Sequence, residues 1–223
     1  MYRRAVLNWT ERWKTIILIL MKKFLNKTKL NRRLFLGAVS AYFALGQAGF
    51  AMTAGHAERL VTKVVSEINK VIASGKSDTA MIHDFERIFN AYSDVDTMAR
   101  YALGRDGKNA SREEVKRFTK VFKSYIAKKY GSRFREFIGG KIEVKSSRKV
   151  KKFFEVKTNA VLKNQGDFEV IFLVSNRSGS PLFFNVFVEG LNLLLTERSE
   201  IGAILDKNKG SMDALIRDLE RAA

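Results

Sequence analysis

The spacing of apolar residues changes once along the chain, near Gly139-Gly140. Before this point apolar residues recur every three or four positions, the period of an amphipathic helix. After it they recur at every second position, the period of a β-strand. We therefore expect a helical N-terminal half followed by a sheet.

The helical half predicts four segments, at residues 57–73, 79–91, 94–104 and 111–138. Asp94 is a suitable N-cap for the third segment, which should end at Gly104. Ser111 and Glu114 have the spacing of a capping box, in which each side chain binds the other residue's backbone N–H. They open the longest helix, which should break near Gly131 and resume briefly.

The second half predicts four strands, at residues 142–144, 153–162, 168–174 and 182–188. The turn signals at 164–167 and 176–179 leave no room for the dozen residues that a parallel crossover needs, so the strands should be antiparallel. Residues 168–174 are apolar at almost every position, which indicates a strand covered on both faces. Residues 191–195 should extend or follow the last strand, and residues 211–221 should form a closing helix.

These elements predict one α+β domain over residues 52–223. A helical N-terminal half packs on a curved antiparallel sheet of about four strands, and a C-terminal helix returns to it.

The N-terminal segment has the layout of an export signal. Residues 34–51 form an apolar run of 18 residues, rich in Gly and Ala, after a cationic stretch. Arg32-Arg33 before Leu-Phe-Leu resembles the twin-arginine motif, although Asn31 and Gly37 depart from its usual residues. The run is near the lower limit for crossing a bilayer, so a membrane anchor is the alternative to a cleaved leader.

The net charge of +18 and the pI of about 10.1 raise the possibility of a nucleic-acid or polyanion binder. Residues 1–51, the leader, hold ten Lys and Arg and one acid, so residues 52–223 carry +9. A basic body is attracted to any anionic polymer or membrane, and charge alone does not choose between them. The leader argues against nucleic acid, because exported proteins rarely meet it.

The chain contains few residues suited to catalysis. It has no cysteine, which excludes disulfides, thiolate metal sites and cysteine nucleophiles. His56 and His83 have no second histidine at metal-binding spacing, and no phosphate loop or nucleophile elbow is present. We predict a protein that is not an enzyme, with no metal and no cofactor. The alternative is an enzyme with a reactive group inside a cavity, and such an enzyme would require carboxylates or histidine at positions that face the cavity.

Two segments resemble a known family, namely FNAYSDVDTMARYALG at 89–104 and VFVEGLNL at 186–193, which Glu197-Arg198-Ser199 follows. Over residues 57–221 the chain resembles the toluene-tolerance/MlaC family of periplasmic phospholipid-binding proteins. It departs from the family at Gly107 and Asn185, where the family usually has Trp and Asp.

The resemblance implies a soluble periplasmic carrier whose helices and sheet enclose an apolar cavity for lipid tails. Such a carrier shuttles phospholipid between an outer-membrane lipoprotein–porin complex and an inner-membrane ABC transporter with a lipid-binding ring, which maintains outer-membrane lipid asymmetry. Exposing the ~30 methylenes of a two-tailed lipid to water costs on the order of 25 kcal/mol, so a carrier needs a dry cavity. Hopanoid or another apolar lipid is the alternative cargo.

Apolar and aromatic side chains on the inward positions are the candidates for contacting lipid. They are Tyr92, Met98, Tyr101, Phe118, Phe122, Tyr125, Phe134, Phe172, Val174, Phe184, Val186, Val188 and Leu193. The candidates for docking to partner proteins are basic: Lys123, Lys128 and Lys129 on the longest helix, and Arg148, Lys149, Lys151 and Lys152 between two strands. A solvated turn is the alternative interpretation of the run at 148–152.

Overall fold

The computed structural model describes residues 52–162 and 166–223, apart from the side chain of Phe134. Residues 52–223 form one compact unit. The expected leader, with its twin-arginine-like motif, lies outside the described residues.

The described elements are α3 (Ala54–Ile72), α4 (Asp78–Tyr92), α5 (Val95–Leu103), η1 (Asp106–Lys108), α6 (Arg112–Gly131), η2 (Ser132–Phe137), β1 (Lys141–Val150), β2 (Phe153–Leu162), β3 (Gly166–Ser175), β4 (Leu182–Val188), β5 (Leu191–Asn192), α7 (Leu193–Lys207) and α8 (Met212–Ala222). The predicted α+β class is confirmed. The antiparallel sheet has five strands in the order β1-β2-β3-β4-β5, rather than about four.

Capping side chains mark the starts of the two helices for which the sequence predicts a cap. Asp94 Oδ1 accepts a hydrogen bond from the backbone N–H of Thr97 at 3.1 Å, as predicted for the start of α5. Ser111 Oγ and Glu114 Oε2 accept from each other's backbone N–H at 3.2 and 2.8 Å, which confirms the capping box of α6. The predicted break near Gly131 is the change from α6 to the 3₁₀-helix η2.

Two strand boundaries differ from the prediction. β1 continues to Val150, so Arg148 and Lys149 belong to the strand and only Lys151-Lys152 form the turn. At the other end of the sheet, β5 contains two residues and α7 already begins at Leu193. The side chain of Asn192 caps this helix by accepting from the N–H of Leu195 at 3.0 Å, which is why the strand ends there.

The passage from helices to sheet requires glycine at residue 140. A Cβ atom there would lie 2.2 Å from the carbonyl oxygen of Val161 on β2. Any side chain would therefore separate the end of η2 from the strand that it approaches.

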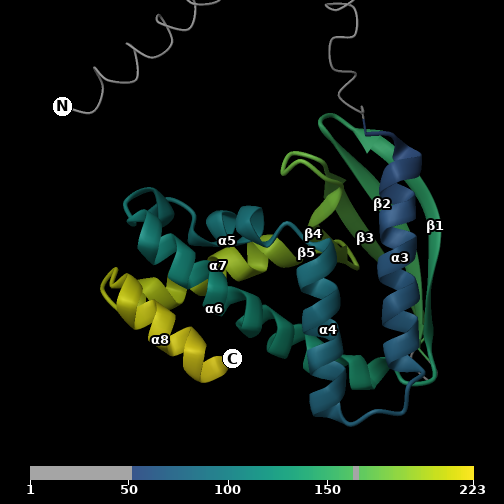
Figure 1. Ribbon diagram of the computed structural model, residues 1–223, viewed down its shortest axis with the longest axis horizontal. Coiled ribbons are helices and arrows are strands. Elements are labelled where there is room, and N and C mark those ends of the chain that lie inside the picture. The colour runs from purple at the N-terminus through teal and green to yellow at the C-terminus, as the bar shows by residue number, and fades with distance from the viewer. Residues whose placement is uncertain (1–51, 163–165) are drawn as a thin grey trace, which may run out of the picture. The chain divides into compact units, whose positions relative to one another are not determined.

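One amide side chain fastens α3 to the first strand. Asn69 Nδ2 donates to the carbonyl oxygen of Ile142, and Asn69 Oδ1 accepts from the N–H of Ile142, both at 2.9 Å. Ser147 Oγ adds a hydrogen bond to Glu58 at 2.6 Å further along the same strand. Helix α3 therefore lies along β1 (Figure 1).

The helices all contribute to one apolar core, which lies against one face of the sheet. Helix α3 packs on β1 and β2, α4 packs on α3 and α6, and α5, α7 and α8 complete the helical part on the far side of α4 (Figure 1). This arrangement leaves the sheet and the helices as two layers with the core between them.

Candidate functional site

The face of the sheet that points toward the helices is apolar along its central strands. We call it the inner face. Its residues are Phe154, Val156, Thr158 and Ala160 of β2, Val170, Phe172 and Val174 of β3, and Phe183, Val186 and Val188 of β4. The one polar side chain in this set, Thr158, donates its hydroxyl to the carbonyl oxygen of Val170 at 2.9 Å, so no hydrogen-bond donor is left unsatisfied on the face.

Aromatic rings connect the inner face to the helices. The ring of Phe183 is edge-to-face with that of Phe172 at 5.5 Å and lies 6.1 Å from the ring of Phe89 on α4. On α6, Phe118 and Phe122 stack at 5.4 Å. Such pairs each stabilise by about 0.5–1.5 kcal/mol beyond the area they bury.

Side chains fill the interior between the two layers. Phe118, Phe122, Val156 and Val174 each have an exposed fraction of 0%. The apolar cavity that the resemblance implied is not seen there, because rings from the helices and from the inner face are in direct contact. Lipid tails in this position would have to move side chains that now pack on one another.

Nine of the thirteen predicted lipid-contacting residues lie in this core or pack against it. They are Tyr92, Met98, Phe118, Phe122, Tyr125, Phe172, Val174, Val186 and Val188. The structure therefore brings most of the predicted set together, and contact of these residues with lipid stays a prediction.

Phe184 does not share the inner face with Val186 and Val188, as strict alternation had predicted. The register between β3 and β4 shifts at Leu173/Val174, and this irregularity adds one residue to β4. Phe183 therefore points into the core, while the ring of Phe184 packs edge-to-face on that of Phe153 at 5.8 Å. The bulge changes the face of every residue before it, so Phe184 lies away from the inner face, and its contact with lipid stays a prediction.

Two further predicted residues lie outside the core. Tyr101 is 39% exposed, because the residues that α5 buries lie on a different face of the helix. Its ring lies 5.2 Å from the guanidinium carbon of Arg198. Leu193, the first residue of α7, is half-buried and does not belong to the core cluster. The side chain of Phe134 lies outside the described ones.

A polar cluster joins α6 to α7 at the edge of the core. Lys129 Nζ forms ion pairs with Glu197 Oε1 at 2.8 Å and with Glu200. The hydroxyls of Tyr130 and Tyr125 donate to Glu197 and Glu200 at 2.5 and 3.0 Å. Glu197 is 2% exposed, and its Oε2 has no hydrogen-bond partner among the described residues.

This cluster removes Lys129 from the predicted docking candidates. Burial alone would lower the pKa of Lys129, but its hydrogen bonds to Glu197 and Glu200 outweigh burial and raise that pKa above its ordinary value. Burial also raises the pKa of Tyr125 to about 12, so its hydroxyl stays protonated and able to donate. The Lys129 ammonium is thus committed to carboxylates of its own chain.

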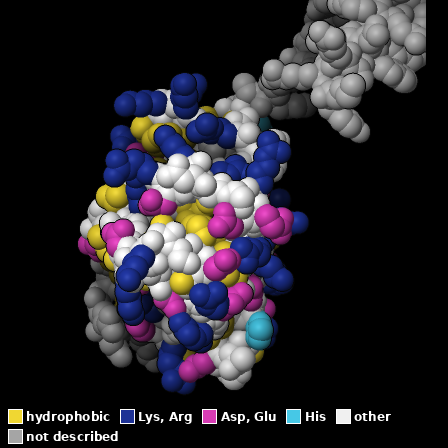
Figure 2. Space-filling view, turned by 90° about the vertical axis from the view of Figure 1, so that its left-hand side faces the viewer, with side chains coloured by type: hydrophobic (Ala, Val, Ile, Leu, Met, Phe, Trp, Pro, Cys, Tyr) yellow, Lys and Arg dark blue, Asp and Glu magenta, His cyan; other side chains and the backbone are white. Residues whose placement is uncertain are grey.

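The other basic candidates are more accessible. At the tip of the β1–β2 hairpin, Lys149, Lys151 and Lys152 are exposed and have no ion pair with a described acid, while Arg148 pairs with Glu155. Lys151 adopts φ +52° to make the turn. Figure 2 shows the helical side of the molecule, where Lys and Arg side chains gather at the top and are mixed with Asp and Glu below.

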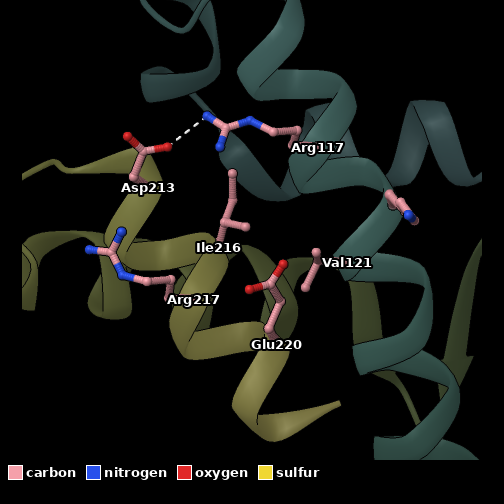
Figure 3. Close-up of a pocket in the computed structure, with 7 residues that line it drawn as sticks. Arg117, Val121, Asp213, Ile216, Arg217 and Glu220 are labelled. Carbon is pink, nitrogen blue, oxygen red and sulfur yellow. Dashed lines mark hydrogen bonds and ion pairs between the residues drawn. The ribbon is translucent and has the colours of Figure 1, made fainter.

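Two pockets open between helices, and both differ from the predicted apolar cavity. The α6–α8 pocket, of about 270 Å³, contains an ion pair between Arg117 and Asp213 at 2.6 Å (Figure 3). The α5–α6 groove, of about 690 Å³, has five basic residues among the ten that line it. Charged side chains line both pockets.

Sequence reasoning missed several residues that shape this region. Phe89 and Phe183 were not among the candidates, although they link α4 to the inner face. Tyr125 and Lys129 are one helical turn apart, and this i,i+4 spacing predicts that they share one face of α6. The spacing does not predict that this face contacts a carboxylate on α7. Only the fold places these two helices side by side.

The described residues contain no group of three or more His, Asp or Glu placed to hold a metal ion. Among the same residues, no helix combines the length and the apolar character needed to cross a membrane.

Comparisons with known proteins agree with this architecture. A search of curated proteins finds no match. Among solved structures, a phospholipid-binding protein from Ralstonia solanacearum, in complex with a phospholipid, superposes with a TM-score of 0.64 at 16% identity, over 74% of this chain and 96% of that one. The family model described as MlaC protein matches residues 58–221, nearly all of the described chain. The chain therefore belongs to the MlaC family.

Proposed function

We propose that this protein binds phospholipid, with the acyl tails between the inner face of the sheet and the helices. Membership of the MlaC family supports this proposal, as does the phospholipid carried by the Ralstonia solanacearum protein of the same fold. The observation that carries it is the inner face itself, a surface on three strands that is apolar except for Thr158 and has no charged residue.

One end of the interior offers an entrance. Phe137, Phe168 and Val188 pack against the core yet stay half-buried, whereas the row nearest the hairpin tip, Phe154, Val174 and Phe183, is fully buried. The rings of Phe137 and Phe168 meet edge-to-face at 5.8 Å, and this contact helps η2 to cover this end of the sheet. We infer that tails enter here as η2 moves away from β3.

Opening the interior has a cost that lipid burial can exceed. Separating an aromatic pair costs about 0.5–1.5 kcal/mol in addition to the cost of exposing the area that the pair buries. Each methylene that leaves water gains about 0.8 kcal/mol, so a pair of tails offsets the separation of several pairs. The chain then has two states, a closed interior without lipid and an open interior with lipid. Binding of lipid shifts the equilibrium from the closed state to the open one.

Binding through burial alone would retain the lipid, so transfer needs docked partners that offer an equally apolar path. In this proposal the protein is a periplasmic carrier between an outer-membrane complex and an inner-membrane lipid transporter. The exposed cations Lys128, Lys149, Lys151 and Lys152 accelerate docking to acidic surfaces.

Reversing the charge of Lys151 and Lys152 should slow lipid transfer between reconstituted partners without changing lipid occupancy. Equal transfer rates in the variant and in high salt would exclude docking through the hairpin.

Lipid occupancy is the direct test. Solvent extraction of the purified protein, followed by mass spectrometry, should release phospholipid; hopanoid or another apolar lipid would identify the alternative cargo. Val188→Glu places a charge at the entrance and should abolish this lipid. Phe187→Glu is the matched control, since Phe187 is the adjacent half-buried residue and points away from the inner face. A folded Val188→Glu protein with a full lipid load would contradict the assignment.

Export is a separate part of the proposal, because the leader is inferred from the sequence alone. Replacing both Arg32 and Arg33 with lysine should hold the precursor in the cytoplasm if the twin-arginine route is used. An unchanged periplasmic amount of the double variant would contradict that route and leave general export in place.

A further inference from the structure

The α5–α6 groove has an unbalanced charge. Its charged residues are Asp96 and Arg100 of α5 and Arg112, Lys116, Lys120 and Lys123 of α6. Five cations therefore face one carboxylate around a volume of about 690 Å³. The remaining lining residues, including Val115 and Thr119, form an uncharged floor.

The cations of the groove are unpaired. None of the five forms an ion pair with an acidic residue in the described part of the chain, although fourteen such contacts occur elsewhere in it. The neighbouring α6–α8 pocket shows the difference. There Arg117 is neutralised by Asp213, and Glu220 lies on the same wall as Arg217 (Figure 3). Lys120 lines both pockets, but the α6–α8 pocket also contains two acidic residues, Asp213 and Glu220, whereas Asp96 is the one acidic residue that lines the α5–α6 groove.

This arrangement works against the stability of the helix. Arg112, Lys116 and Lys120 follow one another at i,i+4, and like charges at this spacing destabilise a helix by about 0.2–0.5 kcal/mol per pair. Arg112 and Lys116 also lie near the positive end of the α6 dipole, where cations are unfavourable. A local arrangement that opposes folding is typical of a surface selected for binding.

We propose that the α5–α6 groove binds an extended acidic segment of a partner protein. The α6 cations run from residue 112 to residue 123, about 16 Å along the helix at about 1.5 Å per residue. An extended chain advances about 3.3 Å per residue, so about five residues fill this length. Alternate carboxylates of such a segment meet the α6 cations, and Asp96 accepts from a backbone N–H.

The shape of the site favours a peptide over a membrane surface. The cations line two walls, α5 and α6, of a concave groove, which an extended chain enters lengthwise. A bilayer surface is flat on this scale and would contact the rim of the groove without entering it. Asp96 stands within the groove, where it repels a phosphate layer and offers an acceptor to an amide.

The proposal deepens the proposed function by assigning a docking surface, and its test is independent of lipid. The probe is a fluorescently labelled hexaglutamate peptide, with binding to the full-length protein followed by fluorescence anisotropy. Binding should weaken at least about tenfold between about 50 and 300 mM salt. Reversing both Lys116 and Lys120 to Glu should weaken it by about tenfold, and Lys116→Gln with Lys120→Gln should weaken it less.

A matched control separates the groove from total charge. Lys63 of α3 and Arg177 of the β3–β4 loop are exposed and have no ion pair with a described acid. Reversing both to Glu changes the net charge as much as the groove variant does, and should change the affinity by less than about twofold. Circular dichroism confirms that each variant is folded.

Three results would overturn the proposal: no binding of hexaglutamate to the wild type, equal losses in the groove and control variants, or loss of binding to phosphatidylglycerol vesicles with peptide binding unchanged. The last result would assign the groove to a membrane surface. Because lipid occupancy is measured separately by extraction, a failure of peptide binding leaves the proposed lipid site intact. An absence of lipid likewise leaves the groove testable.

Discussion

Replacing Lys129 with methionine should destabilise the protein more than any other single lysine substitution on α6. Lys129 and Glu197 lie 2.8 Å apart, with side chains 28% and 3% exposed. Methionine keeps the length of the side chain and removes its charge, so the Glu197 carboxylate stays buried without its cation. The other donor to Glu197, the hydroxyl of Tyr130 at 2.5 Å, remains.

Removing one partner of a buried ion pair costs about 3–5 kcal/mol. The remaining Tyr130 hydrogen bond and the partial exposure of Lys129 favour the lower end, so we expect about 3 kcal/mol. At about 2–4 °C per kcal/mol for a domain of this size, Tm should fall by about 6–12 °C. Urea unfolding followed by circular dichroism measures the same loss as a free energy.

Two further variants complete the test. Lys128→Met removes an adjacent exposed lysine that has no ion pair with a described acid, and it should change stability by less than about 0.5 kcal/mol. Lys129→Met combined with Glu197→Met removes both charges and should recover at least half of the loss. The reasoning is wrong if Lys129→Met unfolds like Lys128→Met, or if the double variant is no more stable than Lys129→Met alone.

Three other substitutions test local features of the fold. Burial raises the pKa of Asp94, but hydrogen bonds from Ser178 and Thr97 outweigh it and hold that pKa below its ordinary value. Asp94→Asn should therefore cost about 1 kcal/mol at neutral pH, with a smaller difference from wild type as pH falls below about 4, measured by urea titrations at both pH values. Gly104→Ala should destabilise by about 1–2 kcal/mol in the same assay, because Gly104 has φ +59° and a Cβ there meets the Arg198 guanidinium at 3.1 Å. Gly202→Ala, in open space on α7, should stabilise by about 0.5–1 kcal/mol.

The order and type of most elements followed from the sequence because local signals determine them. Ser111 and Glu114 satisfy each other's backbone N–H groups wherever the rest of the chain lies, so the start of α6 could be predicted. The four longer strands followed from alternation and turn residues in the same way. The helix at 193–207 did not follow from the spacing of residues, since its cap, Asn192, stands in what looks like a continuing strand.

The candidate site was harder to predict, because its geometry depends on contacts between distant segments. Phe183 and Phe184 are chemically identical neighbours, and only the bulge between β3 and β4 decides which of them enters the core. Lys129 and Lys128 are equally basic in sequence, and only the approach of Glu197 on α7 distinguishes a buried pair from a free cation. The closed interior is likewise a property of packing between layers, which periodicity does not describe.

The amide of Asn69 has a consequence for how this protein behaves at high concentration. β1 is an edge of the sheet, and an edge strand presents unpaired N–H and C=O groups on which a strand of another molecule can add. The side chain of Asn69 occupies the N–H and C=O of Ile142, so these two groups are not available to an incoming strand. The bulge between Val144 and Ser146, together with the lysines along the strand, makes the rest of the edge a poor template for pairing. In the proposed function the layers separate to take up lipid, and this protected edge would keep an open molecule from pairing with its neighbours edge to edge.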